Sequence, residues 1–371
     1  MAIRIGILKE TTDNETRVAL VPEIAKKLAA NGARFHIEKG SGRSAGYNDN
    51  DYPEACVFKK TKKDVLSDCD ILFTVAPPND QDIKLLKESA IVIGFMNPFD
   101  NADLIKQMAK QNLISFSVEL IPRISRAQSM DALSSQASIA GYKAVVLAAN
   151  HSNKFFPMLT TAAGTVRPSQ ILVIGAGVAG LQAIATAKRL GSKVLAFDVR
   201  SSTKEQIESL GAKFLDTGVS AEGDGGYARE LTKEELKKQK EILVENIGQS
   251  DVVITTAAVP GKPAPKLIDK ATVSKMMPGS VIVDLGAVSG GNCEVTKKDE
   301  TIDFEGVIVC GPTNLAATMP KHASELYSKN LANFLLPAMT ENGLHIDWDD
   351  EIFKGANLTN DGKVTFSTNG K

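Results

Sequence analysis

Residues 123–131 (RISRAQSMD) bring together two arginines, a glutamine and an aspartate, groups that can orient a ligand or move a proton. This density first suggests an acid–base active site. Alternating apolar residues over 113–118 predict a strand before the segment, and apolar residues at helical spacing over 130–147 predict a helix after it. Ser125 and Gln128 fit a capping box that opens this helix. A loop held at both ends can fix its side chains, whereas the structural alternative is an exposed turn with solvated charges.

Residues 175–180 (GAGVAG) are a second segment whose spacing could do chemistry, since they lie between an apolar run at 171–174 and a helix. In a dinucleotide-binding turn, the first glycine (Gly175) permits the tight turn and the second (Gly177) lets the backbone approach a pyrophosphate. The third (Gly180) lets the helix pack on the strand, and the helix N-terminus favours the phosphates. This context favours dinucleotide binding over a purely structural glycine turn.

The strand expected over 193–198 ends on Asp198. A carboxylate at this place accepts hydrogen bonds from the adenosine ribose hydroxyls and repels a 2′-phosphate, so we expect NAD(H) rather than NADP(H). Arg200 instead favours NADP(H), because an arginine can bind the 2′-phosphate. The carboxylate at the strand end makes that the minority interpretation.

Composition limits the remaining classes of function. A chain of 371 residues with 43% hydrophobic content is expected to form two or three globular domains, and a net charge of −1 gives no bulk attraction to nucleic acid or to an anionic membrane. The four cysteines and four histidines lack metal-ligand or redox spacing, so we expect reduced thiols and no bound metal. The N-terminus resembles no targeting peptide, and the uncharged run 171–187 is broken by glycines, so a cytoplasmic chain without a transmembrane segment is expected.

In the first third of the chain, short apolar runs alternate with amphipathic stretches, which predicts an α/β domain with a doubly wound, mostly parallel sheet. Strands are expected over 3–8, 34–38, 70–75, 91–96 and 113–118, and helical sequence over 22–29 and 84–89. A helix from about 128 to 150 is too long for a simple crossover and is interpreted as the bridge into a second domain.

The second domain is expected to be a six-stranded Rossmann fold. Its strands are expected over 171–174, 193–198, 213–215, 251–257, 281–285 and 307–310, with a charged helix over 233–245. Prolines in 259–265 predict a stiff lip at one strand end. The glycine-rich segment 222–227 is either a solvated loop or a functional lid.

The last residues of the chain return to the first domain. Residues 322–336 predict an amphipathic helix with Leu326, Leu331, Phe334 and Leu335 on its apolar face, and Asp361-Gly362 predicts a hairpin. The expected domains are therefore a discontinuous, flavodoxin-like or Rossmann-like domain (1–135 plus 322–371) and an inserted NAD(H)-binding Rossmann domain (136–321).

Motifs along nearly the whole chain resemble one family. They are residues 15–22 (ETRVALVP), 122–136 (PRISRAQSMDALSSQ), 140–144 (AGYKA), 162–166 (AAGTV), 175–180, 261–266 (GKPAPK) and 290–293 (GGNC). Together they look like the soluble NAD(H)-binding component (domain I, alpha subunit) of the proton-translocating NAD(P) transhydrogenases, without the membrane helices that some relatives append.

The resemblance implies direct hydride transfer from NADH on this chain to NADP+ on a partner subunit, coupled to proton translocation by a membrane-spanning subunit. The chain would be peripherally associated with the cytoplasmic side of the inner membrane through these partners, and a homodimer is expected. Such chemistry aligns two nicotinamide rings and needs no general base, so the polar segment becomes a clamp that positions one ring.

The family pattern also implies site residues. Around the nicotinamide and its ribose they are Arg123, Gln128, Asp131 and Ser134, as the candidate catalytic residues, with Ser129 and Met130 beside them and Tyr142 further along the helix. The remaining cofactor contacts would come from Gly175, Gly177, Val178, Gly180, Asp198, Val199, Arg200, Gly226, Gln239 and Ala258, with Tyr227 on a loop that closes over NAD(H).

Two other functions compete. Alanine dehydrogenases share the plan, but their pattern places a lysine near Thr74, a histidine near Asn97 and an aspartate near Val288, and this chain has none of the three. Arg17 would be either a relic of their substrate pocket or a salt-bridged residue. A catalytically silent NAD(H)-binding module is the third possibility. Val288-Ser289 and the segment 315–319 also depart from the transhydrogenase pattern, which bears on partner docking.

Overall fold

The computed structural model describes residues 2–219, 231–258 and 261–366. The chain forms two compact units, one made of residues 1–136 and 316–371 (unit 1) and one of residues 137–315 (unit 2). The first unit is thus discontinuous and the second is inserted into it. Each unit has its own sheet and its own hydrophobic cores.

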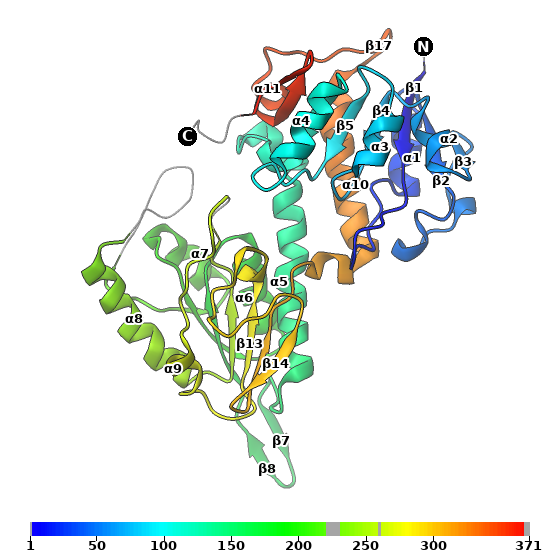
Figure 1. Ribbon diagram of the computed structural model, residues 1–371. Helices are drawn as coiled ribbons and strands as arrows, with labels where there is room; N and C mark the ends of the chain where they lie inside the picture. Colours follow the sequence, from blue (N-terminus) through cyan, green and yellow to red (C-terminus); the bar gives the residue numbers. More distant parts are fainter. Residues whose placement is uncertain (1, 220–230, 259–260, 367–371) are drawn as a thin grey trace. The chain divides into compact units, whose positions relative to one another are not determined.

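Unit 1 contains an eight-stranded sheet in the order β19-β18-β6-β5-β4-β1-β2-β3 (Figure 1). The strands from β3 to β6 are parallel, and β18 and β19 continue the sheet antiparallel at the β6 edge. The bounds are β1 Ile3–Ile7, β2 Ala33–Glu38, β3 Cys56–Lys59, β4 Ile71–Phe73, β5 Ile91–Gly94, β6 Ile114–Ser117, β18 Asn357–Asn360 and β19 Lys363–Val364. A separate short hairpin pairs β16 (Met339–Thr340) with β17 (Gly343–Leu344).

Helices cover both faces of this sheet. Successive side chains of each strand point to opposite faces, so a central strand such as β4 contributes to two cores. Ile71 and Phe73 of β4 belong to a core with residues of α1 and α10, whereas Leu72 belongs to a core with residues of α3 and α4. The helices are α1 Pro22–Ala29, α2 Lys62–Leu66, α3 Asp80–Leu85, α4 Ala102–Lys110, α10 Pro320–Leu335 and α11 Glu351–Ala356.

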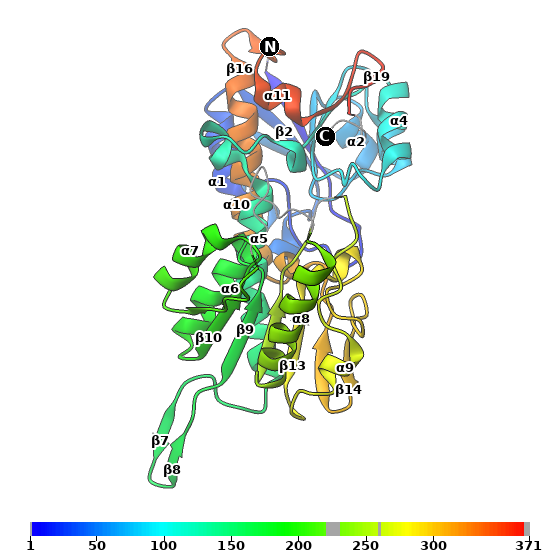
Figure 2. The ribbon, with the colours of Figure 1, turned by 90° about the vertical axis from the view of Figure 1, so that its left-hand side faces the viewer.

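Unit 2 contains a seven-stranded sheet in the order β11-β10-β9-β12-β13-β15-β14 (Figure 2). The bounds are β9 Gln170–Ile174, β10 Lys193–Phe197, β11 Lys213–Phe214, β12 Val252–Thr255, β13 Val281–Asp284, β14 Thr301–Phe304 and β15 Val307–Cys310. All pairs are parallel except β14 with β15. This is the Rossmann order, which reverses direction at β9.

Residues of α5, α6 and α7 share a core with one face of this sheet, and residues of α8 and α9 share a core with the other. The bounds are α5 Ala132–His151, which begins in unit 1, α6 Val178–Arg189, α7 Lys204–Ser209, α8 Lys233–Gly248 and α9 Lys270–Val273. A hairpin of β7 (Leu159–Thr161) and β8 (Gly164–Val166) extends from this unit (Figure 2). The predicted fold class, two doubly wound α/β sheets with the second inserted into the first, is confirmed.

The predicted capping box was wrong. Residues Ser125–Met130 form a 3-10 helix, and α5 begins only at Ala132. Asp131 closes its first turn, since its carboxylate accepts hydrogen bonds from the backbone N–H and the hydroxyl of Ser134, at 2.8 and 2.6 Å. A carboxylate three residues before the donating N–H satisfies a free donor of the helix end, and it is favoured there by the helix dipole.

Other expected elements need correction. Helix α3 ends at Leu85, because Leu86 is extended and buried and Ser89 has a left-handed φ of 60°, so 84–89 is not a helix. Strands β3 and β14 were missed, since each is only four residues long and lies next to charged residues, and β14 makes the second sheet seven-stranded rather than six-stranded.

On α10, Leu326 is 41% exposed and Tyr327 is buried in its place. The buried face of this helix is partly polar, because Ser324 and Ser328 accept hydrogen bonds from the backbone N–H groups of Val18 and Val21. A search for apolar spacing alone cannot detect such a face. The Asp361-Gly362 hairpin is confirmed, with both residues left-handed between β18 and β19.

Candidate dinucleotide site

The glycine turn of unit 2 has the geometry that its spacing predicts. Gly175 directly follows β9 and has a φ of 99°, in the left-handed region that favours glycine, and its N–H donates to the carbonyl of Phe197. A Cβ on Gly180 would lie 1.9 Å from the carbonyl oxygen of Gly175, whereas a Cβ on Gly177 would meet nothing within 4 Å. One glycine thus makes the turn, one closes the packing, and one leaves open space where a ligand can approach.

Helix α6 begins directly after this turn. Gly177 is its N-cap residue, and no side chain in the described ranges caps this end. The first backbone N–H groups of a helix have no acceptor within the helix, and the helix dipole adds a partial positive charge there. Val178 in this first turn is 42% exposed. Such an end is suited to a phosphate or pyrophosphate.

Asp198 follows β10 and is buried next to the turn. Its Oδ2 accepts the N–H of Ala176 at 2.7 Å and the Nη2 of Arg200 at 2.8 Å, and its Oδ1 accepts the backbone N–H and the Nε of Arg200 at 2.9 and 2.8 Å. Burial alone would raise the pKa of this carboxyl, but the Arg200 guanidinium and the two backbone N–H groups outweigh it and lower the pKa. The carboxylate is therefore ionised at neutral pH.

Two buried polar atoms lie on elements that flank the strand ends. Gln239 on α8 and Thr217 after β11 are 4% and 2% exposed, and Gln239 Oε1 and Thr217 Oγ1 have no hydrogen-bond partner within the described ranges. A buried polar atom without a partner is costly, so each is available to a bound group. Gln239 was predicted by the family pattern. Thr217 was missed, and its polar type three residues after the end of β11 was the available signal.

The other predicted cofactor residues of unit 2 divide into two groups. Val199 is half-buried and Ala258 is exposed, at the carboxyl ends of β10 and β12. Gly226 and Tyr227, with the expected lid 222–227, lie outside the described residues, as do the first two residues of the expected lip 259–265.

Sequence reasoning also missed the groups that hold this edge of the sheet. Thr256 Oγ1 donates to the carbonyl of Gly175 at 3.0 Å, which anchors the glycine turn. Asp284, fully buried at the end of β13, accepts hydrogen bonds from Thr255, Thr296, and the N–H groups of Gly286 and Cys293. A buried carboxylate with four donors fixes the loop that contains Gly290 and Gly291.

In the polar segment of unit 1 (residues 123–131), the backbone is fixed by hydrogen bonds and several polar side chains are exposed. Ala127 and Met130 are buried in the unit 1 core, and the carbonyl of Ser129 accepts hydrogen bonds from the side-chain amides of Asn330 and Asn333, both at 3.0 Å. The side chains of Arg123, Gln128 and Ser129 are exposed, and those of Asp131 and Ser134 are half-buried. A fixed backbone with exposed polar groups fits a positioning role better than a free turn does.

Arg126, from the same segment, forms an ion pair within unit 1. Its guanidinium is bidentate to Asp350, with nitrogen–oxygen distances of 2.8 and 2.7 Å, and it also approaches Glu351. The pair ties the segment to the start of α11, whose N-cap is Asp350.

Arg17 forms a salt bridge, which was one of the two interpretations of this residue. Its Nε and Nη2 bind the two carboxylate oxygens of Glu15 at 2.8 and 2.7 Å, and its Nη1 donates to Gln136 Oε1 at 2.9 Å. Thr74 follows β4 and Asn97 follows β5, and Val288 is 60% exposed in unit 2. None of these three side chains can supply the ionisable groups that an amino-acid dehydrogenase needs.

Glu10 is a carboxyl of unit 1 whose pKa is strongly shifted. Its carboxylate accepts the N–H groups of Val75 and Ala76 at 2.6 and 3.2 Å. Burial nevertheless raises the pKa of Glu10 to about 7, because it outweighs these two donors. Burial also raises the pKa of Glu119, which accepts from Ser117 and from the N–H groups of Met96 and Asn97.

We expect stability to fall between pH 4.5 and 7 through Glu10. In this window the folded carboxyl binds a proton that the unfolded one has released, so rising pH favours unfolding, by no more than about 3 kcal/mol for this residue. Urea unfolding followed by the fluorescence of Trp348, the single tryptophan, measures it. Glu10→Gln should reduce the slope and leave the share of Glu119, whereas an unchanged slope would contradict the assignment.

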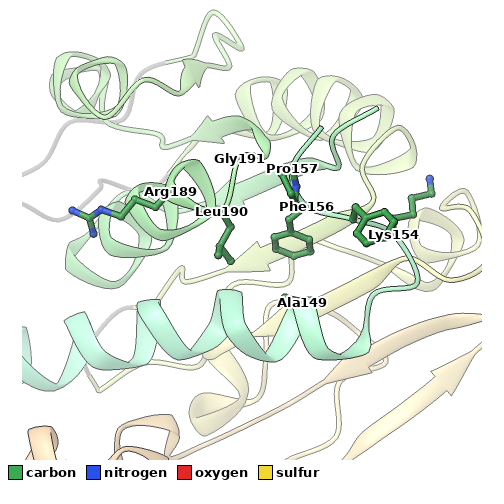
Figure 3. Close-up of a pocket in the computed structure, with 8 residues that line it drawn as sticks. Ala149, Lys154, Phe156, Pro157, Arg189, Leu190 and Gly191 are labelled. Carbon is green, nitrogen blue, oxygen red and sulfur yellow. The ribbon is translucent and has the colours of Figure 1, made fainter. Parts of the chain in front are cut away.

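One cavity of unit 2 lies away from the glycine turn. It has a volume of about 540 Å³ and is lined by Ala149, Lys154, Phe155, Phe156, Pro157, Arg189, Leu190 and Gly191 (Figure 3). Gly191 precedes β10 whereas Gly175 follows β9, and these strands are parallel, so cavity and turn lie at opposite edges of the sheet. Ligands of open parallel sheets bind at the carboxyl ends, which are on the side of the turn.

Further features concern metals and membranes. The described ranges contain no group of His, Cys, Asp or Glu that could hold a metal ion, and the four cysteines are free thiols. No helix in the described ranges is both long and apolar enough to cross a bilayer.

The fold and the glycine turn define a protein of the Rossmann class whose turn is suited to the pyrophosphate of a dinucleotide. Family models make this specific: the N-terminal domain of alanine dehydrogenase/PNT matches residues 6–140, and the C-terminal domain matches residues 144–367. The chain belongs to the alanine dehydrogenase/PNT family.

The similar proteins include both transhydrogenases and alanine dehydrogenases. The chain is 44% identical to the first segment of the NAD(P) transhydrogenase alpha subunit of Rickettsia prowazekii, over 98% of this chain and 96% of the relative. A crystal structure of transhydrogenase from Sinorhizobium meliloti superposes with a TM-score of 0.89 at 42% identity, covering 97% and 99% of the two chains. Alanine dehydrogenase 1 of Staphylococcus aureus is 25% identical, over 97% and 96%. The resemblance to transhydrogenase alpha subunits is confirmed.

Proposed function

We propose that this chain is the NAD(H)-binding component of a proton-translocating NAD(P) transhydrogenase. NADH bound here would pass a hydride directly to NADP+ bound on a partner subunit, and a membrane-spanning subunit would couple the transfer to proton translocation. The observation that carries the proposal is an open glycine turn beside the ionised Asp198, in a chain that has Thr74, Asn97 and Val288 where a dehydrogenase has ionisable groups. The similarity to transhydrogenase subunits supports it.

The chain's own residues would bind and orient the cofactor. Backbone N–H groups at the start of α6 would hold the pyrophosphate, Asp198 the adenosine ribose, and Gln239 Oε1 an amino group of the base. We propose Arg123, Gln128, Asp131 and Ser134 as the residues that set the nicotinamide. Hydride transfer releases no proton from a substrate hydroxyl or amine, so these groups have to align a ring rather than exchange protons.

Mixing the chain with its NADP(H)-binding partner tests the proposal. NADH should then reduce an NADP+ analogue whose reduced form absorbs at a distinct wavelength. L-Alanine with NAD+ should give no NADH with this chain alone. Turnover of alanine would favour the dehydrogenase, and binding without transfer to a competent partner would favour a silent module.

Asp131→Asn should slow this transfer while leaving the fold intact. An asparagine side-chain oxygen can still accept the Ser134 N–H that Asp131 accepts, so helix α5 keeps its cap, but the carboxylate charge is lost. Stopped-flow transfer rates and the circular dichroism of the variant are the measurements. Ser135→Ala is a matched control in the same turn, because Ser135 donates to Ala132 and Asn330 within unit 1. A rate equal to that of the unaltered chain would remove Asp131 from the site.

We also propose a homodimer, a peripheral cytoplasmic location and no contact with nucleic acid. All residues of β7 and β8 are exposed, and the adjoining Phe155 and Met158 are 56% and 63% exposed. An isolated two-stranded hairpin is marginally stable in water, so apolar side chains beside it favour a second copy of the chain as cover. A monomer mass in sedimentation equilibrium would contradict the homodimer.

A further inference from the structure

The acceptor positions of Asp198 are fully used by the chain itself. A carboxylate has about four lone-pair positions, two on each oxygen. Two are taken by the backbone N–H groups of Ala176 and Arg200, and two by the Nε and Nη2 of the Arg200 guanidinium. A ribose diol brings two further hydroxyl donors, for which this arrangement leaves no acceptor.

The four donors are not equivalent. The two backbone N–H groups belong to the glycine turn and to the chain directly after β10, so they stay wherever the fold stays. The guanidinium is carried by a flexible side chain and can leave by rotation about its own bonds. The number of donors it would free is two, which equals the number of ribose hydroxyls. Its side chain is 22% exposed, so it has a path to water, whereas that of Asp198 is 6% exposed.

We propose that the Arg200 guanidinium is a displaceable occupant of the ribose site, which competes with the adenosine end of the dinucleotide for Asp198. The inference deepens the proposed function and rests on its NAD(H) site. Binding then exchanges two charge-assisted N–H donors for two hydroxyl donors and releases the guanidinium. Arg200 therefore lowers the affinity for adenosine, although its positive charge would by itself attract an anionic cofactor.

Adenosine is the probe, because it carries the ribose diol and no phosphate, so attraction between Arg200 and phosphate does not enter. By isothermal titration, Arg200→Met should bind adenosine roughly fivefold more tightly than the unaltered chain, about 1 kcal/mol at 1.4 kcal/mol per tenfold. Arg200→Lys should lie between the two, since an ammonium is a point charge and cannot bridge both carboxylate oxygens as a guanidinium fork does. Arg189→Met is the matched control, at the opposite edge of the sheet, and should leave adenosine affinity unchanged.

Adenosine affinity that is equal or weaker in both Arg200 variants would overturn the proposal. If neither the unaltered chain nor the variants bind adenosine, the ribose site at Asp198 is itself refuted, and the proposed function loses its cofactor site. Tighter binding in Arg200→Met together with no hydride transfer to the partner would refute the proposed function and leave the inference standing.

Discussion

Gly180→Ala is expected to destabilise unit 2 by about 3 kcal/mol and to abolish binding of NADH. The new Cβ would lie 1.9 Å from the backbone oxygen of Gly175, so the turn and helix α6 must separate. Overpacking of a close contact typically costs about 1–3 kcal/mol, and backbone on both sides puts this case at the upper end. Urea unfolding followed by far-ultraviolet circular dichroism gives the loss of stability, and fluorescence titration with NADH gives the loss of binding.

Gly177→Ala is the matched control for this prediction. Its Cβ meets nothing within 4 Å, and Gly177 has a φ of −75°, which alanine adopts readily. The variant should therefore fold as stably as the unaltered chain and still bind NADH more weakly, because the Cβ projects into the space where a pyrophosphate would approach. Equal stability of Gly180→Ala and Gly177→Ala would contradict the division of roles between the two glycines.

Asp198→Ala is expected to weaken NADH binding by about 1 to 3 kcal/mol, the cost of leaving buried hydrogen-bonding groups unpaired. It also frees Arg200 from its carboxylate partner. A guanidinium that is no longer paired with this carboxylate favours a 2′-phosphate, so the preference for NADH over NADPH should shrink or reverse. Fluorescence titrations with both nucleotides measure the two affinities.

Asp198→Asn separates the cofactor role from the structural one. It keeps an acceptor for the Ala176 N–H, so the glycine turn should remain, while the charge that holds Arg200 is lost. Its NADH affinity should fall between those of Asp198→Ala and the unaltered chain. Unchanged NADH affinity in Asp198→Ala would show that this carboxylate does not bind the ribose.

Patterns that depend on near neighbours in the chain were sufficient for much of the architecture. The helix at Pro22–Ala29, the strand at Val307–Cys310 and the Asp361-Gly362 hairpin follow from local spacing and turn chemistry. The glycine turn and Asp198 follow from a motif confined to residues 175–198. Strands β3 and β14 did not, because each is a four-residue edge strand that is stabilised by pairing with a single neighbouring strand, β2 or β15.

By itself, the sequence determined the fold class, the dinucleotide turn and the family, because each is written in residue types at fixed short spacing. Only the tertiary structure decided which donors occupy Asp198, that Asp131 rather than Ser125 caps α5, that Tyr327 rather than Leu326 is buried, and that Arg126 binds Asp350. Each of these depends on which of several available partners comes within hydrogen-bonding or packing distance, often across hundreds of residues. For the polar segment at 123–131 the difference is plain: composition indicated a site, and the contacts of Ser129 with Asn330 and Asn333 showed a backbone held in place.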